Sequence, residues 1–196
     1  MPAKLLTGKE VAQKMDQDIQ KDVQDLKAKG VNPALRIMIV GDAPDSLAYA
    51  NSAKKMAEKN GILCEIEQLP GSTSQDDFVR TLKQRNADTH IHGIIVMRPF
   101  PKQIREDVVK YILSPEKDVD CFNPVNAGKI MAGDMTGFPP ATPQAVASRV
   151  FAALAASART AGTAFSAAVV DGSPAFSPVW NWIVSPSGLT YCAVAR

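Results

Sequence analysis

HIHGIIVMRPFP, residues His90–Pro101, is the stretch of sequence that decides how this chain is expected to fold. Its apolar run Ile94–Met97 is typical of a strand that is buried on both faces of a parallel sheet. The prolines that follow cannot continue the strand, because proline has no backbone N–H to donate. Ligands of open α/β sheets bind at such carboxyl ends of strands. Taken alone, the stretch is explained more simply as an ordinary core strand followed by a loop. The neighbouring segments therefore decide whether a ligand site is expected here.

The segments around this stretch alternate between helical and strand patterns. Apolar residues recur at three- and four-residue spacing from Val11 to Leu26, and this pattern ends at Gly30. Helices are expected up to residue 30, at 46–60, after residue 74 and at 104–113, and strands at 34–40, 62–69 and 94–97. Capping signals precede two of these helices, at Thr7 with Glu10 and at Ser74 with Asp77. The order predicts an α/β fold, a three-layer α/β/α domain with a mainly parallel sheet.

The expected sheet brings three loops to one edge. In a parallel sheet the loops after Val40, after Leu69 and after Met97 emerge on the same side. The strand 62–69 alternates apolar and polar residues, which places it nearer the edge of the sheet. Tyr49 lies on the first turns of a helix that leaves this side, and its ring is expected to face the same cleft as Met97.

Composition excludes several classes of protein. The 196 residues are 45% hydrophobic and 21% charged, the profile of a protein that buries a core. A net charge of +2 without a dense basic patch argues against nucleic-acid binding. Neither an apolar run long enough to span a membrane nor a signal peptide is evident. Cys64, Cys121 and Cys192 are widely spaced and form no metal or disulfide framework, so we expect a cytoplasmic protein without a metal.

The charges divide the chain near Gln144. Residues 145–196 hold three arginines and one aspartate, and they contain no lysine or glutamate. All other charged side chains lie in residues 1–144, where the helix and strand patterns are also found. We therefore expect two parts, an α/β domain over residues 1–144 and a partial or atypical segment over residues 145–196.

Three blocks of sequence carry a family resemblance. They are PALRIMIVGDAPDSLAYANSAKKMAEKNGI at residues 33–62, HGIIVMRPFPKQI at 92–104, and PEKDVDCFNPVNAGKIMAGDMTGFPPATP at 115–143. In order and spacing these blocks resemble the folate-binding half of methylenetetrahydrofolate dehydrogenase/cyclohydrolase. The resemblance covers about residues 3–144.

The resemblance implies two reactions on one folate substrate. The dehydrogenase step moves a hydride from the methylene carbon to NADP or NAD, and it requires chiefly that two rings be held face to face. The cyclohydrolase step adds water to the resulting methenyl carbon and opens the ring, so it needs proton transfers from a poised acid or base. The resemblance also implies a homodimer formed through the cofactor domain.

The resemblance assigns site residues at the expected edge of the sheet. Tyr49 matches the tyrosine that stacks on the folate and lines the catalytic site, although a tyrosine on an amphipathic helix is more often a core or boundary residue. Asp120 matches the catalytic-site carboxylate that holds the pterin ring, and its alternative is a turn aspartate near Pro115. The substrate-binding loop is expected to comprise Met97, Arg98, Pro99, Phe100 and Pro101.

Two departures from the family pattern bear on the chemistry. The family usually places a catalytic lysine four residues after the tyrosine, where this chain has Ala53, and a glutamine that orients the lysine where this chain has Met97. Lys54 and Lys55 are adjacent in sequence, but each residue turns a helix by about 100°, so a solvated role is favoured for both. We therefore predict that dehydrogenase activity is kept and that cyclohydrolase activity is weak or lost.

Two smaller departures lie in the loops. Arg98 stands where the family commonly has leucine, and it could contact the glutamate tail of the folate or point to solvent. Cys121 replaces the usual glycine after Asp120, and a residue other than glycine resists a positive φ there.

The resemblance ends after Pro143. Residues 145–196 are expected to form a degenerate or truncated Rossmann-like segment, in which Gly172 and Ser173 are faint candidates for binding the cofactor. The segment is either a shortened cofactor domain or a frame-shifted or misassigned sequence. Two functions stay open: a folate-dependent dehydrogenase, and a non-catalytic folate-binding or dimerising fragment.

Overall fold

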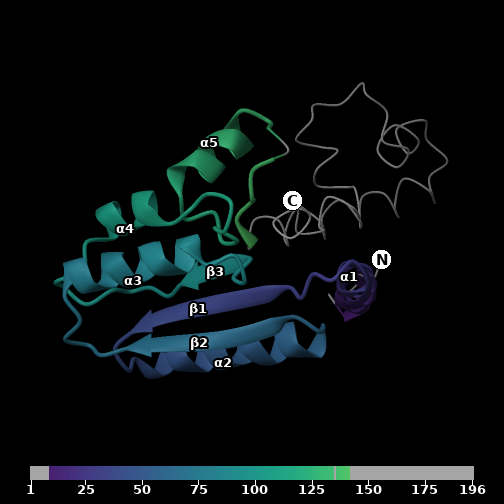
Figure 1. Cartoon of the computed structure of the whole chain (residues 1–196), viewed down its shortest axis with the longest axis horizontal. Coiled ribbons are helices and arrows are strands. Elements are labelled where there is room, and N and C mark those ends of the chain that lie inside the picture. The colour runs from purple at the N-terminus through teal and green to yellow at the C-terminus, as the bar shows by residue number, and fades with distance from the viewer. Residues whose placement is uncertain (1–8, 135, 142–196) are drawn as a thin grey trace, which may run out of the picture.

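A parallel three-stranded sheet lies at the centre of the molecule (Figure 1). The computed structural model describes residues 9–134 and 136–141. The strands β1 (Ala34–Val40), β2 (Leu63–Leu69) and β3 (Gly93–Val96) lie in the order β2-β1-β3. Both pairs are parallel, and β2 is at an edge, so the predicted parallel sheet and the predicted edge position of strand 62–69 are confirmed.

Five helices surround this sheet in the described part of the chain. They are α1 (Lys9–Ala28), α2 (Pro44–Lys59), α3 (Gln75–Ala87), α4 (Glu106–Ile112) and α5 (Pro124–Met131). Figure 1 shows α2 on one side of the sheet and α3 with α4 on the other. This arrangement is the predicted three-layer α/β/α domain. The sequence reading missed α5, which begins where Asn123 accepts a hydrogen bond from the Val125 amide at 2.8 Å.

Helix boundaries follow local signals. Ser74 accepts a hydrogen bond from the Asp77 amide at 3.2 Å, which confirms the predicted cap of α3. The other predicted cap involves Thr7, which lies outside the described residues. Helix α4 begins later than expected, because Arg105 is extended and its amide donates to Gln75 Oε1 at 2.6 Å.

Two apolar clusters fill the two spaces between the layers. Successive residues of a strand point to opposite faces. Met38 and Val40 of β1 therefore enter a cluster shared with α3 and α4, which includes the fully buried Phe78. The other cluster lies between the sheet and α2. Its buried members are Ile37, Ile39, Ala50, Ala57 and Cys64. We call this second group the α2 cluster.

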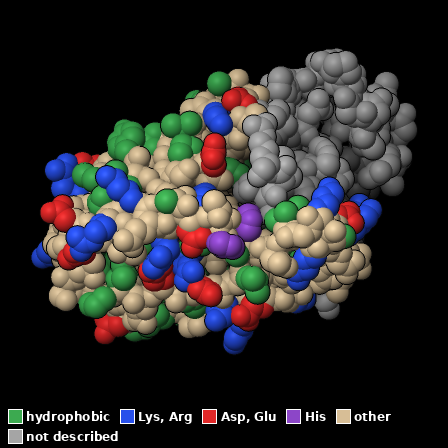
Figure 2. Space-filling view, in the orientation of Figure 1, with side chains coloured by type: hydrophobic (Ala, Val, Ile, Leu, Met, Phe, Trp, Pro, Cys, Tyr) green, Lys and Arg blue, Asp and Glu red, His purple; other side chains and the backbone are tan. Residues whose placement is uncertain are grey.

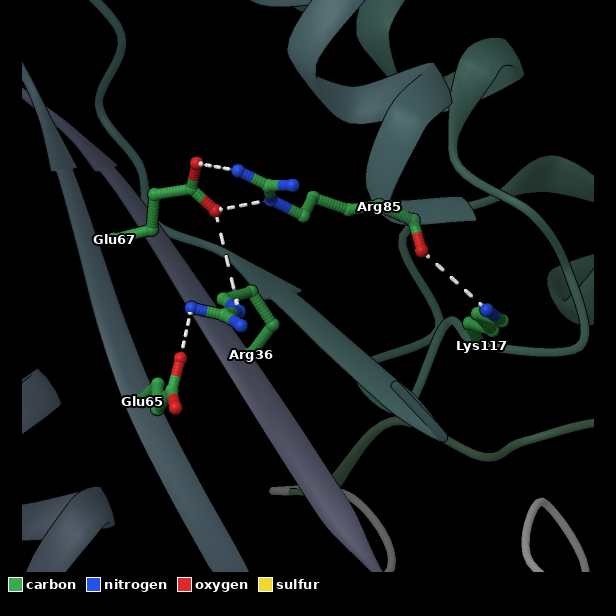
Figure 3. A network of polar contacts seen from close by, with 5 residues as sticks. All are labelled: Arg36, Glu65, Glu67, Arg85 and Lys117. Carbon is green, nitrogen blue, oxygen red and sulfur yellow. Dashed lines mark hydrogen bonds and ion pairs between the residues drawn. The ribbon is translucent and has the colours of Figure 1, made fainter. Parts of the chain in front are cut away.

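A network of charged side chains crosses the α3 side of the sheet (Figure 3). Arg85 of α3 donates two hydrogen bonds, of 2.7 Å each, to the carboxylate of Glu67 on β2. Arg36 of β1 forms an ion pair with Glu65, and its Nε atom lies 4.0 Å from Oε2 of Glu67. The hydrogen bond from Arg85 holds the pKa of Glu67 below its ordinary value. The network ties α3 to β1 and β2.

The surface carries charges of both signs. On the face drawn in Figure 2, lysine and arginine side chains are interspersed with aspartate and glutamate. No helix within the described residues is both long enough and apolar enough to cross a membrane.

Candidate functional site

Three loops meet at the carboxyl ends of the strands. The amide of Gly41 donates to the carbonyl of Leu69 at 2.9 Å, which joins the loops after β1 and β2. The amide of Met97 donates to the carbonyl of Met38 at 2.9 Å, which holds the start of the third loop against β1. The predicted gathering of these loops on one edge of the sheet is therefore confirmed.

Gly41 and Gly71 lie where the first two loops touch. Gly41 has a φ of +92°, a left-handed conformation that side chains rarely adopt, and a Cβ built there would lie 3.8 Å from the Cα of Gly71. Gln103, beyond the third loop, donates to the carbonyl of Gly71 at 2.7 Å and to that of Thr73 at 3.2 Å. Backbone and amide groups thus fix the whole edge.

Tyr49 projects from α2 near this edge. Helix α2 begins at Pro44, directly after the turn that follows β1, so Tyr49 occupies its second turn. The helix turns Ser46, Ala50 and Ala57 inward, whereas Tyr49 is 59% exposed. The structure therefore does not bury Tyr49 in the core but leaves it exposed.

Ala53 and Met97 border the α2 cluster from two different layers of the fold. Both side chains are half-buried and pack against that cluster, Ala53 from the helix and Met97 from the end of β3. Lys54, the next residue, forms an ion pair with Glu58 at 3.8 Å on the helix surface. Lys55 is exposed. The position between helix and strand end, where the family resemblance expects a lysine and a glutamine, is thus occupied by apolar groups.

The segment that carries Asp120 runs beside β3. The amide of Ile94 donates to the carbonyl of Lys117 at 2.7 Å, and Ile94 and Asp118 form a parallel bridge. Gly93 makes this approach possible, because a Cβ at that position would lie only 2.9 Å from Cγ1 of Val119. Asp120 follows on the same side of β3, towards the strand's carboxyl end.

Asp120 is a half-buried carboxylate with a perturbed pKa. Burial raises the pKa of Asp120, the charge of Arg98 lowers it, and the charge of Asp118 raises it further. Among residues 9–134 and 136–141, no side chain or amide donates a hydrogen bond to the Asp120 carboxylate. The alternative role of turn aspartate belongs instead to Asp118, a fully buried residue that sequence reasoning did not single out. The sequence offered no local signal for this role, because Asp118 and Asp120 are the same residue type two positions apart.

The loop after β3 is held by aromatic contacts. Arg98 lies with its Cζ atom 5.0 Å from the centre of the Phe122 ring and forms an ion pair with Glu106 at 3.4 Å. Phe100 packs edge-on against Phe78, with 5.7 Å between the ring centres, and it also packs against Phe122, with 6.5 Å between the ring centres. Arg98 therefore makes specific contacts, and Phe100 anchors the loop to the core.

The remaining residues of this loop border the edge. Pro99 is exposed and Pro101 is half-buried. Gly172 and Ser173, the candidates for binding the nicotinamide cofactor, lie outside the described residues, as does the whole of residues 145–196. Within the described residues, no three His, Cys, Asp or Glu side chains are arranged to hold a metal ion.

The fold and this edge define a class of protein: a parallel α/β domain whose candidate small-molecule site is built at the carboxyl ends of its strands. A sequence model described as tetrahydrofolate dehydrogenase/cyclohydrolase, catalytic domain, matches residues 6–120. The chain belongs to this family.

Relatives and solved structures agree with this assignment. The bifunctional protein FolD of Alkaliphilus metalliredigens is 44% identical over 142 residues, which are 72% of this chain and 50% of that protein. The crystal structure of bifunctional FolD from Campylobacter jejuni matches with a TM-score of 0.69 and 34% identity, over 71% of this chain and 50% of that one. The FolD structure from Trypanosoma brucei, complexed with NADP cofactor and an inhibitor, matches with a TM-score of 0.66 and 27% identity, over 83% and 54%. The chain thus spans about half the length of these relatives.

Proposed function

We propose that the described domain binds a reduced folate at the carboxyl edge of the sheet and serves methylenetetrahydrofolate dehydrogenation. The family membership, the start of α2 directly after the turn that follows β1, and the run of the Asp120 segment beside β3 support the proposal. NADP or NAD, when bound, supplies the hydride acceptor. Gly172 and Ser173, the residues assigned to hold it, lie outside the described part.

The residues of the edge hold and orient the folate. The exposed ring of Tyr49 offers a face on which the folate stacks. The Asp120 carboxylate accepts hydrogen bonds from the donor-rich edge of the pterin. Because the segment of Asp120 is fixed against β3 and the loop of Arg98 is fixed by Phe100, the two sides of the site are rigid relative to each other. Positioning of this kind is the main requirement of hydride transfer.

We further propose that this site has weak or absent cyclohydrolase activity. The observation that carries this part is the contact of Ala53 and Met97 with one apolar cluster, because neither side chain can hold or move a proton. Lys54 is turned to Glu58 on the helix surface. Tyr49 and Asp120 are unaffected by these exchanges, so folate binding and hydride transfer are expected to persist.

The experiment supplies the purified chain with two substrates. Methylenetetrahydrofolate with NADP, and separately with NAD, is followed for nicotinamide reduction. Methenyltetrahydrofolate is followed for decay above its uncatalysed rate. We expect nicotinamide reduction and no enzymatic decay of methenyltetrahydrofolate, and robust hydrolysis would refute the loss of cyclohydrolase activity.

The second candidate is a non-catalytic folate-binding or dimerising fragment. It differs from the first candidate in the cofactor, whose assigned residues Gly172 and Ser173 lie outside the described residues. This candidate predicts that tetrahydrofolate binds, as seen by isothermal titration calorimetry, while neither NADP nor NAD is reduced. Sedimentation of the chain at several concentrations tests the homodimer that the family resemblance implies.

A further inference from the structure

The aspartate two residues before Asp120 is enclosed by hydrogen-bond donors. Asp118 is fully buried. Its Oδ1 atom accepts from the amides of Asp120 at 3.3 Å and Phe122 at 3.0 Å. Its Oδ2 atom accepts from the Asn123 amide at 2.8 Å and from Asn126 Nδ2 at 2.9 Å. One carboxylate therefore organises the entire turn that follows it.

The donors that surround Asp118 are themselves anchored. Asn123 donates to the carbonyl of Leu113 at 2.7 Å, which ties the turn to the end of α4. Asn126 donates to the carbonyl of Pro115 at 2.9 Å, which ties α5 to the segment before Asp118. Both asparagines are buried, so these hydrogen bonds are strong and costly to lose.

The same turn contains a conformation that needs support. Cys121 has a φ of +56°, in the left-handed region that a side chain disfavours. The two amides that Asp118 Oδ1 binds belong to Asp120 and Phe122, the residues on either side of Cys121. The Asp118 carboxylate thus clamps the backbone where it is least favourable.

The neighbouring residues fix the segment from other directions. Lys117 donates to the carbonyl of Asp88 at 2.6 Å, at the end of α3, and also reaches the carbonyl of Arg85 (Figure 3). Val119 packs over Gly93. In the run 117–120, Asp120 differs from its neighbours. Within the described residues its backbone amide is hydrogen-bonded to Asp118, but its carboxylate accepts no hydrogen bond.

We propose that Asp118 is a positioning residue: its carboxylate fixes the backbone of residues 120–123 and so aims the Asp120 side chain at the folate. The inference rests on the proposed role of Asp120 in folate binding. It adds a residue that the family resemblance did not assign.

The test uses Asp118→Asn in the full chain, because asparagine keeps the size of the side chain but presents a donor where Asn123 and Asn126 also donate. Asp134→Asn is the matched control, since Asp134 accepts the Thr136 amide at 2.9 Å in a separate turn. Circular dichroism establishes that each variant is folded. If Asp118→Asn does not fold, Asn126→Ala is used in its place, because it removes one of the four donors to the Asp118 carboxylate.

The first readout needs no ligand. The carboxyl carbon of Asp120 is titrated by NMR and assigned with Asp120→Asn. The charge of Asp118 raises the pKa of Asp120, so Asp118→Asn is expected to lower it; for Asn126→Ala the expected change is a new chemical shift of the same carbon. An unchanged Asp120 titration curve and chemical shift in a folded variant would overturn the inference.

The second readout is tetrahydrofolate affinity by calorimetry. We expect Asp118→Asn to weaken binding by about tenfold, the scale of one charge-assisted hydrogen bond, and Asp134→Asn to leave it unchanged. Equal affinity in wild type and Asp118→Asn also overturns the inference. Failure of the wild type to bind refutes the proposed function instead. The chemical shift of the Asp120 carboxyl carbon in Asn126→Ala, which keeps the charge of Asp118, then decides whether the enclosure of Asp118 sets the position of Asp120.

Discussion

Ala53 of α2 and Met97 at the end of β3 pack against the same apolar cluster. The two residues are far apart in sequence, and the sheet brings them to one space beneath the carboxyl edge. Replacement of only one of them by a polar group would leave that group facing an apolar neighbour. The pair therefore has to change together if proton-transfer chemistry is to exist here.

The double variant Ala53→Lys/Met97→Gln is expected to gain cyclohydrolase activity. A lysine at 53 and a glutamine at 97 would meet across the same space, and a positioned acid or base contributes about 10²- to 10⁴-fold to proton transfer. The decay of methenyltetrahydrofolate measures the gain, which each single variant should show only weakly. Lys54→Ala is the control and should change nothing, because Lys54 pairs with Glu58. A double variant that is folded and inert would contradict the proposed role of this pair.

Asp120→Asn is expected to weaken tetrahydrofolate binding and to stabilise the protein at neutral pH. The pKa of Asp120 is raised chiefly by burial, so the folded state favours its protonated form. Stability from this group is complete below its unfolded pKa and is lost as the pH rises through its folded pKa. Asparagine has no charge to lose, so urea unfolding at several pH values should show the variant gaining on the wild type as the pH rises. A parallel pH dependence in both would contradict the assignment.

Cys121→Gly is expected to stabilise the fold. The left-handed conformation at Cys121, with φ +56°, costs a side-chain-bearing residue about 1 kcal/mol, which glycine avoids. Part of that gain is offset by the greater freedom of glycine in the unfolded chain. Thermal unfolding measures the net change. Cys121→Val, with a β-branched side chain, should be less stable than the wild type, and the reverse order of the two variants would show that packing of the thiol dominates.

His92→Asn is expected to remove part of the loss of stability at mildly acidic pH. Nδ1 of His92 accepts the Ala34 amide at 3.2 Å, and burial, followed by the charges of Lys117 and His90, lowers the pKa of His92. For a base whose folded pKa is depressed, stability is complete above the unfolded pKa and is lost as the pH falls through the folded pKa. Asparagine keeps an acceptor but does not titrate. His90→Asn, at an exposed residue, is expected to change this loss of stability less, because the charge of His90 comes after burial and the charge of Lys117 among the causes that lower the pKa of His92.

Gly93→Ala is expected to destabilise the fold and weaken tetrahydrofolate binding together. The new methyl group would lie 2.9 Å from Cγ1 of Val119 and 3.2 Å from Cδ1 of Leu35, and such overpacking costs about 1–3 kcal/mol. Because Val119 precedes Asp120, the same displacement reaches the site. Gly128→Ala in α5 is the matched control: a Cβ there meets nothing within 4 Å, so this variant should be as stable as the wild type or more so.

The local pattern of the sequence determined the elements and their order. The alternation of β2 predicted the edge position that the sheet shows, because burial on one face only leaves polar residues at every second position of a strand. Helix α5 was missed because its eight residues are too short to show a clear apolar period. Its Asn123–Pro124 start was the readable signal.

Only the tertiary structure decided which aspartate of the site is enclosed by hydrogen-bond donors and which is not. Asp118 and Asp120 are the same residue type two positions apart, and nothing in their local pattern distinguishes them. Asn123 and Asn126 pack around Asp118 and enclose its carboxylate. Asp120 lies beyond the bridge to β3, and its carboxylate is half-buried and within the influence of the charge of Arg98. The placement of Ala53 and Met97 against one apolar cluster was likewise decided by the sheet, because packing between distant residues depends on the register of the strands and not on either segment alone.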